Sequence, residues 1–223
     1  MQFTKLAVSV CALMLAPAAA MAAESWDLTP LSSVADESGF GTLYDSLSSN
    51  FAAGSGGFSG TVDSRVYVDA LPASQVTFVF DVTMSGTVYT PMQDMTIAAG
   101  AGQNDLRITE IAGGTNGYVS GTTTNVPDNA DAYNNDFPTV DELFYEWVSS
   151  TMGSSDRATL FVTTTGAVDV GQVNVAFQDA GGASGLVLAP VDNDSDPDLN
   201  VPEPASLLLF GAGACAALRR RRH

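Results

Sequence analysis

The sequence predicts a mainly β protein, built as a single antiparallel β-sandwich domain with one or two short helices. Short segments in which apolar and polar residues alternate recur along most of the chain, and this period of two is typical of half-buried strands. Polar or glycine-rich turns separate these segments at intervals of roughly ten residues, which is the spacing of strands in a sandwich. The segment 24–201 is long enough for one domain with its own core.

Several segments carry this alternation clearly. In the segment 75–84, Val76, Phe78 and Phe80 fall on one face of an extended chain, and the residues between them fall on the other. We expect strands at 61–70, 75–84, 158–165, 172–177 and 185–189, and further short strands at 87–89 and 105–111.

Two other parts of the body show a helical spacing. Apolar residues between positions 24 and 59 recur at near-helical intervals, so short helices or turns are expected there. Thr139 and Glu142 form a capping box, and Leu143, Phe144 and Trp147 follow on one helical face. We therefore expect a helix over 139–148 that covers one open end or face of the sandwich.

The N-terminus has the order of a secretory signal peptide. Lys5 precedes an apolar, helix-forming run at 6–15, and the small residues Ala20 and Ala22 flank Met21. We expect signal peptidase to cleave after Ala22. The alternative is a membrane anchor, but the apolar run is shorter than the roughly 17–25 residues that span a bilayer.

The C-terminus combines a proline motif, a short apolar run and an arginine cluster. The apolar run, 205–218, would reach only about 21 Å as a helix at ~1.5 Å per residue, which is short of a hydrocarbon core of ~30 Å. Arginines stop transfer on the cytoplasmic side. The pattern predicts transient insertion into the inner membrane, with a plain C-terminal anchor as the alternative. The motif residues are Val201, Pro202, Glu203 and Pro204, and the membrane stop is Arg219, Arg220, Arg221 and Arg222.

These C-terminal residues resemble the PEP-CTERM sorting signal. The resemblance covers residues 201–223, and it implies that a membrane enzyme, exosortase, recognises the Pro-Glu-Pro segment and processes the protein for the cell surface or extracellular matrix. It also implies a Gram-negative host that makes exopolysaccharide. The same region resembles what is called an ice-binding protein C-terminal domain, a label to which we attach no functional weight.

The chain therefore divides into four parts. These are the signal peptide at 1–22, a β-sandwich body at 23–190, an Asp-rich linker at 191–200, and the sorting signal with its short hydrophobic helix at 201–223.

The body is strongly acidic. Only Glu203 of the 25 acidic residues lies outside 24–201, and the basic residues inside are Arg65, Arg107 and Arg157. Residues 24–201, which span the body and the Asp-rich linker, thus hold 24 acids against three arginines, a net charge of −21. Because such a surface repels phosphate backbones, we expect no binding of nucleic acid, whereas divalent cations would be attracted.

Three residue types that carry much enzyme chemistry do not occur in the body. Cys11 and Cys215 lie in the two targeting segments, His223 is the last residue, and Lys5 is the one lysine. The body therefore has no residue that could act as a thiolate nucleophile, an imidazole base or a Schiff-base lysine, and none that could bind a metal through histidine or cysteine. We expect no catalytic residues and no enzymatic activity.

Two acidic segments raise the question of calcium. Asp192, Asp194, Asp196 and Asp198 have the spacing of an EF-hand loop, but Pro197 stands where that loop needs glycine. An extended, self-repelling linker is the favoured interpretation, with no required cofactor. The second segment, 128–136, is expected to be an oxygen-rich polar loop.

The function that these observations predict is that of an exported surface or matrix protein, associated with exopolysaccharide and of unknown molecular activity. One alternative is a calcium-assisted carbohydrate-binding module that uses aromatic residues such as Tyr133 and Trp26. A second alternative is a glycoside hydrolase that uses a carboxylate pair such as Glu142 and Glu146, although two acids four apart on a helix are usually a solvated face.

Overall fold

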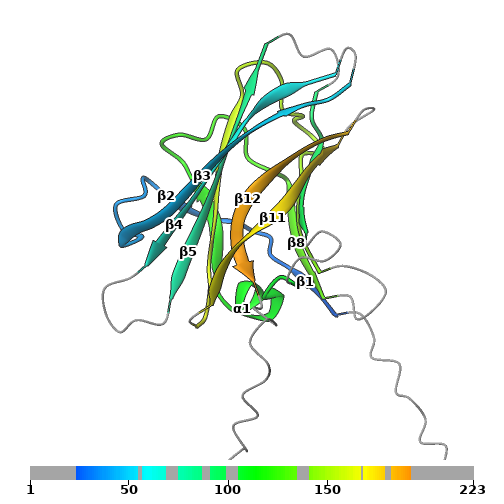
Figure 1. The fold of residues 1–223 in the computed structure, drawn as a ribbon. Coiled ribbons are helices and arrows are strands. Elements are labelled where there is room, and N and C mark those ends of the chain that lie inside the picture. The colour runs from blue at the N-terminus through cyan, green and yellow to red at the C-terminus, as the bar shows by residue number, and fades with distance from the viewer. Residues whose placement is uncertain are drawn as a thin grey trace, which may run out of the picture.

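Two six-stranded sheets pack face to face in the computed structural model, which describes residues 24–54, 57–68, 75–86, 91–98, 105–134, 141–166, 168–178 and 182–191 (Figure 1). The predicted mainly β sandwich is therefore confirmed. The signal peptide, the residues after 191 and the strand expected at 87–89 lie outside the described residues.

The first sheet, which we call sheet A, has the strand order β1-β8-β9-β6-β11-β12 and is antiparallel throughout. Its strands are β1 (Glu24–Asp27), β6 (Asp94–Ala98), β8 (Asn129–Asn134), β9 (Glu142–Glu146), β11 (Asp169–Gln178) and β12 (Ala183–Val191).

The second sheet, sheet B, has the order β2-β7-β10-β5-β4-β3 and is antiparallel except where β2 runs parallel to β7. Its strands are β2 (Ser32–Val34), β3 (Thr42–Ala52), β4 (Ser59–Val68), β5 (Val76–Ser85), β7 (Thr115–Val119) and β10 (Arg157–Thr163). The sequence patterns indicated no element at β6 and β7, which are short and half polar, and they assigned helices or a loop to β1, β2, β3, β8 and β9.

The core lies between the sheets and follows the alternation of the longer strands. Phe78 and Phe80 of β5 point inward and are fully buried, as the pattern of that strand predicts. Phe51 of β3 stacks on Phe177 of β11, with ring centroids 3.9 Å apart, so aromatic packing joins sheet B to sheet A. Such contacts stabilise a sandwich through both buried area and ring geometry.

Sheet A ends at β12, and serine hydroxyls occupy part of this free edge. The amide of Leu188 donates to Ser64 Oγ at 2.9 Å, and the amide of Leu186 donates to Ser49 Oγ at 3.2 Å. Pro190, two residues further on, has no amide to satisfy. Because an open edge invites pairing with other chains, these contacts protect the sheet and hold it to β3 and β4.

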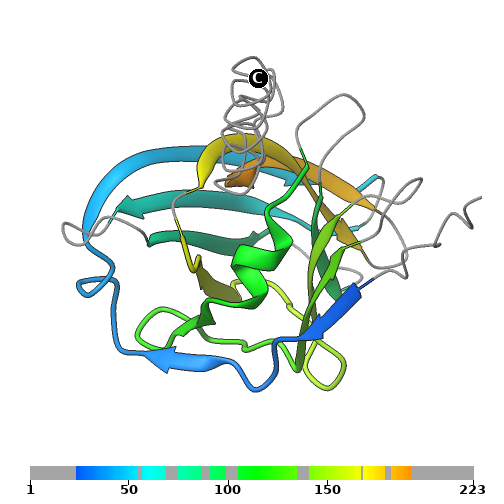
Figure 2. The same cartoon turned by 90° about the horizontal axis from the view of Figure 1, so that it is seen from below.

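One end of the sandwich is closed by the helix α1 (Ile108–Ala112), which lies across the opening between the sheets in Figure 2. Ile108 and Ile111 are buried there. The strand expected at 105–111 is therefore wrong over its helical part, although Leu106 still forms a bridge to Val191. Among the described residues no helix is long and apolar enough to cross a membrane.

The helix expected at 139–148 is also wrong. Residues 142–146 form the strand β9, which pairs with β8 on one side and β6 on the other. Leu143, Tyr145 and Trp147 alternate into the core, where all three are fully buried. Two long-range ladders and three buried side chains outweigh a local capping box, because tertiary packing routinely overrides weak local preference.

The short helices expected between 24 and 59 are likewise replaced by strands, namely β1, β2 and β3. The near-helical spacing there arises because these are edge strands, whose residues are mostly exposed and carry little alternation. The loop expected at 128–136 is corrected in the same way, since Asn129–Asn134 is the strand β8.

A segment that we call the strap, residues 35–41, connects the two opposite edges of sheet B, from β2 to β3. Figure 2 shows this blue segment running from β2 along one side of the molecule to β3. Phe40 of the strap packs on Phe161 and Tyr67, with centroids 4.9 Å and 5.9 Å away. With Val79 and Val119, these rings form a second, small apolar cluster on the outer face of sheet B.

Candidate functional site

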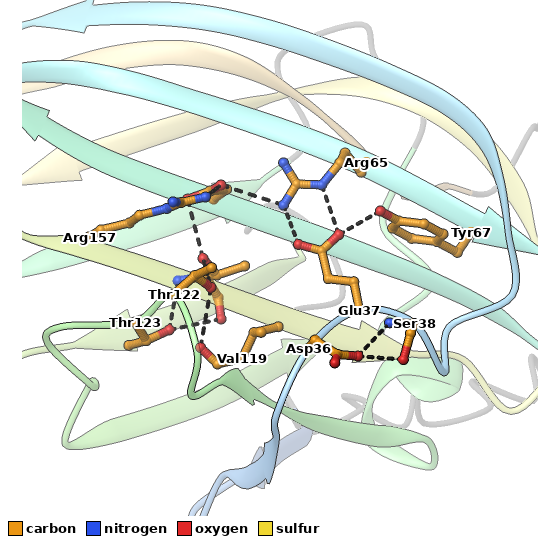
Figure 3. Close-up of polar contacts among 11 residues, drawn as sticks. Asp36, Glu37, Ser38, Arg65, Tyr67, Val119, Thr122, Thr123 and Arg157 are labelled. Carbon is orange, nitrogen blue, oxygen red and sulfur yellow. Dashed lines mark hydrogen bonds and ion pairs between the residues drawn. The ribbon is translucent and has the colours of Figure 1, made fainter.

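A cluster of charged residues lies on the outer face of sheet B, beneath the strap (Figure 3). Its centre is Asp81 of β5, whose side chain is only 4% exposed. Arg157 of β10 binds this carboxylate with two groups: its Nε donates to Oδ1 at 2.7 Å, and its Nη2 donates to Oδ2. Such a two-point contact matches the planar geometry of both groups.

Arg65 of β4 connects this buried carboxylate to the strap. Its Nη2 lies 3.5 Å from Asp81 Oδ2 and 2.6 Å from Glu37 Oε1, while its Nε donates to Glu37 Oε2 at 3.0 Å. The hydroxyl of Tyr67 also donates to Glu37 Oε2, at 2.5 Å. We call Glu37, Arg65, Tyr67, Asp81 and Arg157 the arginine cluster.

The charges of the cluster reinforce one another. Burial lowers the pKa of Arg65, but the hydrogen bonds and charge of Glu37, together with the charge of Asp81, outweigh burial and raise it. The hydrogen bonds from Arg157 to Asp81 raise the pKa of Arg157. Burial and the contact with Glu37 raise the pKa of Tyr67, so the phenol stays protonated and continues to donate.

Both guanidinium groups of this cluster are thus already engaged by carboxylates. Two of the three arginines in residues 24–201, a segment with 24 acids, serve to attach the strap to sheet B. The arrangement is that of a structural fastening, because arginines that bind an external anion need donors left unoccupied.

The outer face of sheet A carries a second group of charges, which we call the acidic face. The strand registers place Asp27 opposite Asp131 and Asp94 opposite Glu146 on neighbouring strands, with Glu142 further along β9. Like charges directly opposite each other destabilise a sheet. Burial, followed by the charges of Asp27 and Glu146, raises the pKa of Asp131.

The described part of the acidic face holds no metal-ligating group, and its two glutamates on β9 lie on a strand and not on a helix. Among the described residues, no three acidic, histidine or cysteine side chains are grouped so as to hold a metal ion. Glu142 and Glu146 stand at the two ends of a strand, where four residues span about 13 Å at ~3.3 Å each. This strand replaces the helical face on which the two acids were expected to form a pair.

Polar residues of the segment that suggested a second calcium loop form hydrogen bonds with other residues of the protein. Asp128 accepts hydrogen bonds from the amide and the hydroxyl of Ser149, at 2.8 Å and 2.6 Å, and these bonds lower its pKa. Asn129 donates to Glu146 at 2.9 Å. These contacts therefore join the start of β8 and the residue before it to the end of β9 and the segment that follows β9.

The aromatic residues considered for sugar stacking are distributed over the molecule. Tyr133 is half-buried on the acidic face opposite Glu142, and the half-buried Phe144 of β9 stands opposite Asp131 on the same strand pair. Trp26 packs against the core, and Tyr67 belongs to the arginine cluster. The most exposed aromatic residue among the described residues is Tyr44, which is 69% exposed and lies at a bulge in β3. The sequence patterns did not single out this ring, because they predicted a helix or turn in this segment.

The sorting residues and their surroundings lie outside the described residues, and so does the Asp192–Asp198 run. The family comparison decides what the C-terminus is: residues 200–222 match the PEP-CTERM protein-sorting motif. The chain carries a PEP-CTERM sorting motif. No curated protein and no solved structure matches the chain.

The PEP-CTERM motif implies that exosortase processes the protein and that it is exported for sorting to the cell surface. The motif starts at residue 200, shortly after β12 ends at Val191. The residues between can reach at most about 30 Å at ~3.3–3.6 Å each. Val191 itself is held on both sides, by Asp169 of β11 and by the bridge to Leu106.

Proposed function

We propose that this chain is a non-enzymatic surface or matrix protein of a Gram-negative, exopolysaccharide-producing bacterium. Its signal peptide is removed after Ala22, its C-terminal helix enters the inner membrane transiently, and exosortase then delivers the sandwich to the envelope. The observation that carries the proposal is the PEP-CTERM motif placed directly after a closed, acidic sandwich.

The structure supports this proposal in two ways. The start of β1 and the end of β12 both lie at the lower end of the molecule in Figure 1, so both membrane segments attach to one end of the body. The charged groups of the arginine cluster bind each other, and Glu142 and Glu146 lie at the two ends of the strand β9 and not on one helical turn.

The sorting step is tested by replacing Pro202 and Pro204 with alanine in the full chain, expressed in a host that has exosortase. Mass spectrometry of surface and membrane fractions should find the native chain at the surface, shortened at its C-terminus, and the variant in the membrane with its C-terminus intact. The control is Pro197→Ala, which removes a nearby proline outside the motif. Surface delivery of the double variant at the native level would contradict the proposal.

The acidic face favours a second candidate function, the binding of polysaccharide. Phe144 and Tyr133 lie half-buried on a sheet face that also presents carboxylates and the hydroxyl of Thr96. Sugars stack on aromatic rings and share hydroxyl hydrogen bonds with such groups. We expect retention on exopolysaccharide of the host to fall at least fivefold in Phe144→Ala.

The matched control for this test is Tyr44→Ala, which removes an exposed ring from the other sheet. Retention in EDTA distinguishes direct binding from calcium-assisted binding. Equal retention of the native chain, Phe144→Ala and Tyr44→Ala would remove this second candidate and leave the sorting proposal intact.

A further inference from the structure

The first strand of the folded body begins almost at the predicted signal-cleavage site. β1 starts at Glu24, two residues after Ala22, and pairs along its whole length with β8. Two residues span at most about 7 Å. The bond expected to be cleaved, between Ala22 and Ala23, is therefore at most about 7 Å along the chain from Glu24, the first paired residue of β1.

A peptidase needs the residues on both sides of its target bond to be accessible and extended. Exposed segments without tertiary pairing are the ones that proteases cut. In the docked state Trp26 packs against the core and Leu28 is buried, and the amide of Leu28 donates to the Ala130 carbonyl at 2.8 Å. The docked β1 and the cleavable β1 are therefore mutually exclusive conformations.

The docking of β1 is also opposed by charge. Asp27 stands directly opposite Asp131, and like charges in that position destabilise strand pairing. β1 has only four residues, so Trp26 and Leu28 supply most of the apolar contact that holds it. The short length of β1 and its like-charge pair both reduce the free energy that is gained when this strand docks.

We propose that β1 joins sheet A only after the signal peptide has been removed, so that cleavage completes the sandwich. This inference rests on the export step of the proposed function. Water hydrolyses the Ala22–Ala23 amide, which leaves a carboxylate on Ala22 and an amino group on Ala23. Before that step, the β8 edge at Asn129–Asn134 lacks its partner strand.

The first experiment compares hydrogen exchange in the precursor and in the mature chain, both in the same detergent micelles. The informative amide is that of Ala132, which faces β1, as does Ala130, whose amide donates to Thr29 Oγ1 at 3.1 Å. We expect exchange at Ala132 to be at least tenfold faster in the precursor. The internal control is Val175 in β11, which is buried and distant in the strand order. Equal exchange at Ala132 in both forms would overturn the proposal.

The second experiment locks β1 in place with a disulfide. Ser25 and Tyr133 are directly opposite, and such residues have Cα atoms about 4.5–5.5 Å apart, within disulfide range. The full chain carries Ser25→Cys and Tyr133→Cys, with Cys11 and Cys215 replaced by serine. Purified signal peptidase should cleave the oxidised precursor at least tenfold more slowly than the reduced one.

The matched control locks a different strand pair, through Ala176→Cys and Ser184→Cys, which are opposite each other on β11 and β12. Its oxidised precursor should be cleaved at the rate of its reduced form. Equal cleavage of the oxidised and reduced Ser25–Tyr133 variants would disprove mutual exclusion. If the reduced precursors are not cut after Ala22 at all, the export step itself fails, and this inference fails with it.

Discussion

At the scale of single residues, Asp81 is the buried charge around which the arginine cluster is organised. A carboxylate this deep in a sheet face is tolerated because guanidinium groups and the Thr159 hydroxyl surround it, the latter at 3.3 Å. The alternation of β5 placed Asp81 on the polar face. The sequence could not show its partners, because Glu37, Arg65 and Arg157 come from three separate segments.

Replacing Asp81 with asparagine should destabilise the body by about 2–4 kcal/mol, since it leaves two guanidinium groups near each other without their shared counter-ion. The value lies toward the low end for buried pairs because Arg157 is 39% exposed and regains some water. Urea unfolding measures it, with the exposed Asp169→Asn on β11 as control, expected to change stability by less than about 0.5 kcal/mol. An unchanged unfolding midpoint for Asp81→Asn would refute the fastening role.

Two aspartates should respond to pH with opposite signs. The folded pKa of Asp131 lies above its ordinary value of 3.8, so its unfavourable charge is absent below 3.8 and fully present above the raised pKa. The folded pKa of Asp128 lies below 3.8, so its stabilising contribution is present above 3.8 and lost as the pH falls through the lowered value.

The opposite signs can be tested by comparing the stabilities of the Asp131→Asn and Asp128→Asn variants with that of the native body. At pH 7 the first variant should be more stable than the native chain and the second less stable. Both differences should shrink toward pH 3, as followed by thermal unfolding. The same sign for both variants at pH 7 would contradict the assignment.

At the scale of elements, long alternating strands were predictable and short or exposed ones were not. β4, β5, β10, β11 and β12 each bury one face, or both, so their sequences report their surroundings. β9 was mistaken for a helix because its capping box is local, whereas the ladders that make it a strand come from β6 and β8. The sequence could not predict the strap, because the strap connects the two opposite edges of sheet B, and the positions of these edges are known only from the folded sheet.

The serine contacts at the β12 edge make a prediction for this element. Ser64→Ala leaves the buried amide of Leu188 without its acceptor, which should cost about 1–3 kcal/mol. Chemical denaturation tests this, with the exposed Ser48→Ala on β3 as control. If both serine variants unfold at the same denaturant concentration, the hydroxyl does not stabilise the edge.

At the scale of the whole molecule, the net charge of −21 on residues 24–201 opposes the compact state. Salt screens this repulsion, with a Debye length of about 10 Å at 0.1 M and 3 Å at 1 M. The melting temperature should therefore rise by a few degrees between about 10 mM and 1 M sodium chloride, an effect that scanning calorimetry resolves. A body whose arginine–carboxylate pairs dominated its electrostatics would instead become less stable as salt is added.

Calcium provides a sharper test of the same charge distribution. No described group of acids is arranged as a metal site, and Pro197 stands where an EF-hand loop formed by Asp192–Asp198 would need glycine. Calcium and magnesium at equal ionic strength should therefore raise the melting temperature of the mature chain equally, through screening alone. A calcium-specific rise that is lost in Asp194→Asn but kept in Asp169→Asn would instead establish a site in the linker. Such a site would make the last residues before the PEP-CTERM motif part of the folded body, and so bring the body closer to exosortase.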